Sequence, residues 1–87
     1  MRTAMESLTA EQLEEIRQLI RENGYLPYSP KALRLIDQAD RLLRQSPQFD
    51  PTQINNLRDQ INEKGYLPSS KGQALVDEVQ RLQELLR

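Results

Sequence analysis

Carboxylates are the side chains in this sequence best suited to acid–base or metal chemistry. Glu11 and Glu15 are four residues apart, and Asp37 and Asp40 are three residues apart. On helices, these spacings place each pair of carboxylates on one face. A carboxylate metal site in a helical protein also needs inward-facing acids and a Glu-x-x-His motif. The sequence contains no His, so we interpret these acids as parts of solvated helix faces.

The missing residue types exclude several classes of enzyme. The 87 residues include no Cys and no His, which removes disulfides, serine or cysteine hydrolase triads and ordinary zinc hydrolases. A chain of this length also makes a poor cleft for carboxylate-only chemistry. We therefore expect a protein that is not an enzyme and has no cofactor, no metal and no small-molecule substrate.

Basic residues suggest an alternative function, the binding of nucleic acid. A helix, a short turn and a second helix form the framework of many DNA-binding units. Asp37 and Asp40 interleave with the basic residues, and 12 Lys and Arg against 13 Asp and Glu give a net charge of −1. Both features favour a solvated face. The basic residues of this alternative lie on the second predicted helix and at the start of the fourth: Lys31, Arg34, Arg41, Arg44 and Lys71.

An internal repeat organises the chain. Residues 12–29 align with residues 53–70 at an offset of 41, with nine of eighteen positions identical, including Gly-Tyr-Leu-Pro. Further along, the offset falls to 40, as in Asp37/Asp77. We predict an all-α fold of two tandem helix–extended-loop–helix hairpins, with a repeat of about 41 residues, forming a four-helix domain. The predicted single domain spans residues 1–87, with repeat one at 8–46 and repeat two at 49–87.

Capping residues predict where the first and third helices begin. Thr9 as N-cap and Gln12 at N3 match a capping box. Asp50 as N-cap and Pro51 at N1 play the corresponding part in the second repeat. The first and third helices should therefore start at equivalent positions of the two repeats.

The Gly-Tyr-Leu-Pro element connects the two helices of each predicted hairpin. Gly24 and Gly65 lie where a helix C-terminus needs a positive φ, and the prolines hold the chain extended. The second helices are predicted over 30–45 and from 71 to the chain end, with Ser70 as the N-cap of the latter. The tyrosine of each element is expected to pack over its own hairpin.

The predicted helices over 30–45 and from 71 to the chain end have wider apolar faces than the first and third helices. We base the predicted function on this difference. The 4, 3, 4 spacing of the leucines and valine on helix 4 forms a short heptad seam. We predict a small protein–protein interaction or assembly module that uses these two faces, with a homodimer as the expected form. A central helix pair within one chain is the alternative. The predicted partner-binding residues are Tyr28, Leu33, Leu75, Val79, Leu82 and Leu86.

The sequence gives no sign of a membrane segment. No stretch approaches the roughly 18 uninterrupted apolar residues that a span requires. The N-terminal Met-Arg-Thr-Ala-Met-Glu-Ser-Leu lacks the apolar core of a signal peptide. We therefore expect a cytoplasmic protein without membrane contacts.

Overall fold

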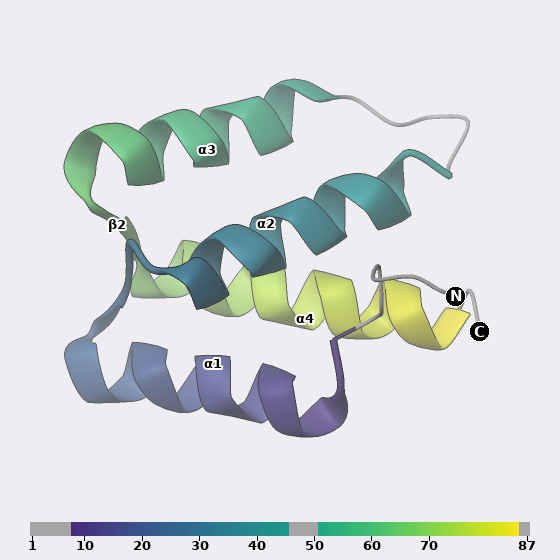
Figure 1. Ribbon diagram of the computed structural model, residues 1–87, viewed down its shortest axis with the longest axis horizontal. Coiled ribbons are helices and arrows are strands. Elements are labelled where there is room, and N and C mark those ends of the chain that lie inside the picture. The colour runs from purple at the N-terminus through teal and green to yellow at the C-terminus, as the bar shows by residue number, and fades with distance from the viewer. Residues whose placement is uncertain (1–7, 46–50, 86–87) are drawn as a thin grey trace.

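Four helices dominate the structure, which confirms the predicted all-α four-helix domain. The computed structural model describes residues 8–45 and 51–85. In both halves of the chain a helix, a three-residue strand and a second helix follow one another (Figure 1). The elements are α1 (Ala10–Asn23), β1 (Tyr25–Pro27), α2 (Pro30–Leu43), α3 (Pro51–Lys64), β2 (Tyr66–Pro68) and α4 (Ser69–Leu85).

Three of the four helices begin where the sequence places them. The Thr9 hydroxyl accepts from the Gln12 N–H at 3.0 Å, and the Gln12 side chain accepts from the Thr9 N–H at 2.9 Å. Pro30 opens α2 behind Ser29, whose hydroxyl caps the helix. Pro51 opens α3, whereas its predicted cap, Asp50, lies outside the described residues.

The fourth helix begins earlier than predicted. Helix α4 starts at Ser69, directly after β2, so Ser70 lies inside the helix and is not its N-cap. In the first half, Tyr28 and Ser29 separate β1 from α2. The shorter connection in the second half lies where the repeat offset falls from 41 to 40.

A glycine in the left-handed region ends each of the outer helices, as predicted. Gly24 has φ 80° and Gly65 has φ 83°. Their backbone N–H groups donate to the carbonyls of Ile20 at 2.7 Å and Ile61 at 2.9 Å. These bonds satisfy carbonyls at the helix C-terminus and turn the chain into the strands.

The two extended segments pair with each other, which the sequence analysis did not predict. Strands β1 and β2 form an antiparallel ribbon in which Leu26 lies opposite Leu67. The Tyr28 N–H continues the ladder by donating to the Gly65 carbonyl at 2.9 Å. Leu26 and Leu67 are both fully buried. The ribbon therefore joins the two halves of the chain and anchors them to the core.

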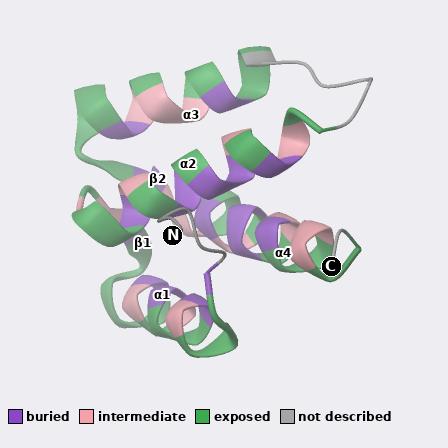
Figure 2. Cartoon of the chain, turned by 45° about the vertical axis from the view of Figure 1, so that its right-hand side comes forward, coloured by how far each residue is buried: buried purple, intermediate pink, exposed green. Residues whose placement is uncertain are grey.

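The helices pack across the two halves. Helix α1 lies against α4, α3 lies against α2, and α2 and α4 form the central pair (Figure 1). Buried residues line the inner faces of the helices (Figure 2). The wide apolar faces of α2 and α4 thus meet each other, as the alternative interpretation held. None of the described helices is long and apolar enough to cross a bilayer.

Gly72 allows α4 to approach the first half closely. A Cβ atom at this position would lie 3.0 Å from Ile20 Cδ1 and 3.2 Å from Leu26 Cβ. Such distances are tighter than ordinary van der Waals contact. Gly72 is buried in the first turns of α4, so a side chain at this position would force Ile20 and Leu26 to shift.

Candidate functional site

The predicted partner-binding residues do not form one surface. Leu75 and Val79, two of the predicted contacts, are buried in the core at 6% and 0% exposure, which leaves them almost no surface for a partner. Their side chains fill the space between α4 and its neighbours. Leu33 and Leu82 are partly buried against the same core. Leu86 lies outside the described residues, and Tyr28 is 52% exposed.

Three tyrosines at the ribbon are the exposed aromatic side chains of the described residues. Tyr25, Tyr28 and Tyr66 are 40%, 52% and 39% exposed, and we call them the tyrosine surface. Tyr25 and Tyr66 follow the helix-terminating glycines on opposite strands, whereas Tyr28 comes directly after β1. The ribbon therefore brings together residues that are 41 positions apart in the sequence.

Tyr25 and Tyr66 contact each other across the ribbon. Their ring centroids are 5.4 Å apart at an interplanar angle of 62°. This edge-to-face arrangement is one of the favoured geometries for aromatic pairs. About two-fifths of the surface of each of these residues remains exposed to solvent. The pairing of the strands across the halves thus adds a contact between the two tyrosines that the sequence did not predict.

The basic residues of the nucleic-acid alternative are divided among different places. Lys31 pairs with Glu15 of α1 at 3.4 Å. These two residues and Arg34 line a small hollow between α1 and α2. Arg41 and Arg44 line another hollow together with two aspartates of α2. Lys71 donates to the Gln60 side chain at 3.0 Å. These cations therefore have acidic or amide neighbours. Four of them follow α2 to its C-cap, and Lys71 lies at the start of α4.

Equivalent ion pairs link the two halves on both sides of the molecule. Arg17 of α1 contacts Asp77 of α4 at 2.8 Å, and Arg58 of α3 contacts Asp37 of α2 at 2.7 Å. The hydrogen bond to Asp37 raises the pKa of Arg58, against the smaller opposing effect of burial. The aligned Arg17/Arg58 and Asp37/Asp77 identities are the sequence signal for these contacts.

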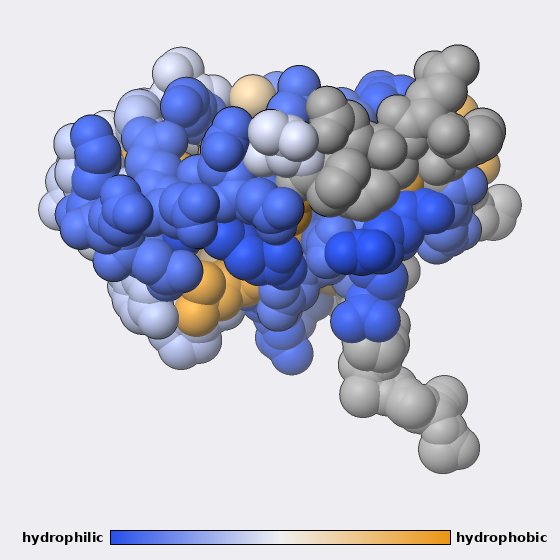
Figure 3. Space-filling model, turned by 90° about the horizontal axis from the view of Figure 1, so that it is seen from above, coloured by the Kyte–Doolittle hydropathy of each residue, from blue (hydrophilic) through white to orange (hydrophobic). Residues whose placement is uncertain are grey.

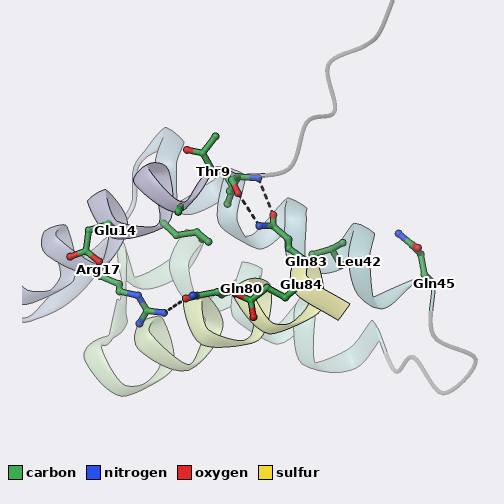
Figure 4. Close-up of a pocket in the computed structure, with 11 residues that line it drawn as sticks. Thr9, Glu14, Arg17, Leu42, Gln45, Gln80, Gln83 and Glu84 are labelled. Carbon is green, nitrogen blue, oxygen red and sulfur yellow. Dashed lines mark hydrogen bonds between the residues drawn. The ribbon is translucent and has the colours of Figure 1, made fainter. Parts of the chain in front are cut away.

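A groove of about 670 Å³ lies between α1 and the second half of α4 (Figure 4). Its polar lining combines three glutamines with the charged Glu14, Arg17 and Glu84, and Arg17 donates to Gln80 there at 2.7 Å. Gln83 binds both backbone groups of Leu8, at 2.9 and 2.8 Å. The buried Gln38 donates to the same Gln83 oxygen at 3.1 Å. These bonds fasten the chain entering α1 to α4.

Exposed aromatic groups at the ribbon are the main chemical feature of the described surface. Among them, no three His, Cys, Asp or Glu side chains gather closely enough to hold a metal ion. The face seen in Figure 3 is largely hydrophilic, with small separate apolar patches. The tyrosine surface is thus the place where aromatic groups are both exposed and held by ordered backbone.

Comparison with known proteins leaves the site to be interpreted from its own chemistry. No protein-family model, no curated protein and no solved structure matches the chain.

Proposed function

We propose that this protein is a non-enzymatic protein–protein interaction module that binds its partner through the tyrosine surface. The observation that carries the proposal is the gathering of exposed aromatic groups. Three of the four large exposed apolar side chains of the described residues are Tyr25, Tyr28 and Tyr66, and the fourth is Leu85. Tyrosine is enriched in protein interfaces because its ring buries apolar area while its hydroxyl keeps a polar partner.

The backbone beneath the tyrosine surface supports this proposal. Leu26 and Leu67 are fully buried between the exposed tyrosines, and the two glycine caps fix the chain on either side. A tyrosine side chain has only two rotatable χ angles, so ordering it in a complex costs little entropy. Binding to a preorganised surface of this kind costs less conformational entropy than binding to a mobile loop, which must first become ordered.

The size of the surface favours a short segment of another protein as the partner. A large aromatic side chain has up to about 250 Å² to bury, so the three tyrosines expose on the order of 300 Å². A stable interface between folded proteins buries about 800 Å² on each partner. A second copy of the chain would need considerably more contact area than this surface offers.

The proposed contact region is thus the ribbon end of the molecule and not the apolar faces of α2 and α4. Those faces pack together in the core, which removes the main argument for a homodimer. The proposed location is the cytoplasm, and the absence of Cys is compatible with a reducing compartment.

Affinity capture from a lysate of the source cells tests the proposal. The bait variants are the wild type, a triple variant with Tyr25, Tyr28 and Tyr66 changed to Ser, and the control Leu85→Ala. We expect partners that the wild type and Leu85→Ala retain equally and that the triple variant loses at least tenfold. Circular dichroism must show equal helicity for all three baits.

Two outcomes would contradict the proposal. Equal capture by a folded triple variant would place the contact elsewhere. Capture that nuclease treatment or moderate salt abolishes would favour the nucleic-acid alternative, because phosphate contacts weaken steeply as salt rises.

A further inference from the structure

The contact between Tyr25 and Tyr66 has a chemical consequence beyond partner binding. The two phenol rings are in edge-to-face contact at 5.4 Å, and each residue is about 40% exposed. The geometry points to this pair as a site of oxidative modification, at which a peroxidase and hydrogen peroxide join the two rings as dityrosine. The cross-link would connect β1 to β2 and thus the first half of the chain to the second.

The composition directs oxidation toward these rings. The chain contains no Cys, no Trp and no His, and Tyr25, Tyr28 and Tyr66 are its three tyrosines. Thiols and indoles, the usual competitors for one-electron oxidants, are therefore absent from the sequence. The two methionines react by a different route, in which an oxygen atom is added to sulfur. A radical formed on Tyr25 or Tyr66 thus has a second phenol in contact with it.

The coupling balances in atoms and electrons. The peroxidase removes one electron and one proton from each phenol, and the two electrons and two protons reduce one hydrogen peroxide to two waters. The two tyrosyl radicals then form a carbon–carbon bond between the ring positions next to the hydroxyl groups. Each ring returns to its phenol form by shifting its hydrogen from that carbon to oxygen. The protein loses two hydrogen atoms in total.

The ribbon supplies the proximity that this coupling needs. Its antiparallel pairing and the buried Leu26 and Leu67 fix the two Cα positions. Exposed side chains still reorient within picoseconds to nanoseconds, so the rings can reach the coupling geometry. Holding two reactants together in this way makes their reaction effectively unimolecular. Intramolecular coupling should therefore exceed coupling between molecules in dilute solution.

The test treats the dilute full-length protein with horseradish peroxidase and hydrogen peroxide. The variants are Tyr25→Phe, Tyr66→Phe and the matched control Tyr28→Phe, because phenylalanine keeps the ring but cannot form the phenoxyl radical. Dityrosine fluorescence is measured on the monomer fraction after size exclusion. Mass spectrometry after trypsin then seeks residues 22–31 joined to residues 65–71, with the mass of two hydrogens lost.

We expect the wild type and Tyr28→Phe to form the cross-link in the monomer fraction. Tyr25→Phe and Tyr66→Phe should each reduce it at least tenfold. Three results would overturn the inference: no dityrosine in the wild type, dityrosine confined to cross-linked dimers, or loss of the monomer signal in Tyr28→Phe. This test is independent of partner binding, because it needs only the purified chain.

Thermal unfolding of the cross-linked monomer adds a second readout. A covalent tie between Tyr25 and Tyr66 closes a long loop containing α2 and α3. By analogy with disulfides that close loops of similar length, we expect the Tm to rise by about 10 °C or more. An unchanged Tm in the isolated cross-linked monomer would mean that the cross-link strains the folded state as much as it restrains the unfolded chain. The native ribbon would then not hold the two rings in a geometry suited to coupling.

Discussion

Arg17 and Arg58 make the same kind of contact in the two halves of the molecule. Each reaches from the first helix of one half to an aspartate on the second helix of the other half, Asp77 or Asp37. The aspartate side chains are 67% and 60% exposed, so water screens both pairs. Such pairs contribute little free energy, and their role is to favour the pairing of α1 with α4 and of α3 with α2.

A double-mutant cycle measures the contribution of one such pair. We expect Arg58→Gln, Asp37→Asn and the double variant to give a coupling free energy of about 1 kcal/mol or less. High salt should reduce it further. The pKa of Arg58 is raised in the folded protein. Its contribution is therefore complete below the pKa of the unfolded chain and is lost as pH rises through the raised pKa. Both values lie far above neutrality, so the titration of Arg58 adds no pH dependence near pH 7. The coupling free energy is measured by urea denaturation of the four proteins. A value several times larger than expected would contradict the screening of this pair by water.

The backbone conformation of Gly65 gives a second prediction at this scale. Its φ is 83°, and an added Cβ would meet no atom within 4 Å. The whole cost of Gly65→Ala is therefore backbone strain, about 1–2 kcal/mol of unfolding free energy. Asn tolerates this conformation better, so Gly65→Asn should cost less. Equal stability of the wild type and Gly65→Ala in urea denaturation would exclude the left-handed conformation.

Local chemistry explains which elements the sequence could predict. The Thr9 capping box, Pro30, Pro51 and the glycine termini depend on residues within a few positions of one another. The pairing of β1 with β2 joins residues about 40 positions apart, and three residues per strand carry too little pattern to predict it. Local sequence therefore predicts the extended segments but not their pairing with each other.

The candidate site was predicted less well for the same reason. Tyr28 was selected because its counterpart in the repeat is Ser69, and it is exposed. Leu75 and Val79 were selected for their spacing, yet helical spacing is the same for a core face and a partner face. Only the packing of the other elements, chiefly α1 and α2, against α4 shows that the chain itself covers them.

The packing of α4 against the first half depends on Gly72. Gly72→Val should lower the unfolding free energy by about 1–3 kcal/mol, because the valine side chain would overlap Ile20 and Leu26. Ala74→Val on the exposed side of α4 is the matched control and should cost about 0.5 kcal/mol or less. Thermal unfolding followed by circular dichroism measures both, and equal Tm values for the two variants would contradict the close approach.

At the scale of the whole molecule, neither half can bury its own apolar surface. Helix α1 depends on α4, and α3 depends on α2. Each of these outer helices has 14 residues, and isolated helices of about that length are marginal in water. The folding unit is therefore the pair of halves, although the order of elements within each half is the same.

Separated halves should fold only together. Peptides of residues 8–46 and 49–87 should each show little helix by circular dichroism. An equimolar mixture should gain helicity well above the sum of the two spectra. A stable helical fold in either peptide alone, monomeric by light scattering, would show that the hairpins are self-contained.

The arrangement of helix ends also decides how the protein can be presented in an experiment. Helix α1 begins and α4 ends at the end of the molecule opposite the ribbon (Figure 1), and Gln83 bonds the incoming Leu8 backbone to α4 there. A biotin or a fluorophore attached through a cysteine introduced at the exposed positions Ala10 or Leu85 would therefore lie at the end of the molecule opposite the tyrosines. Immobilisation on a sensor chip would then orient every molecule with its aromatic end toward the analyte.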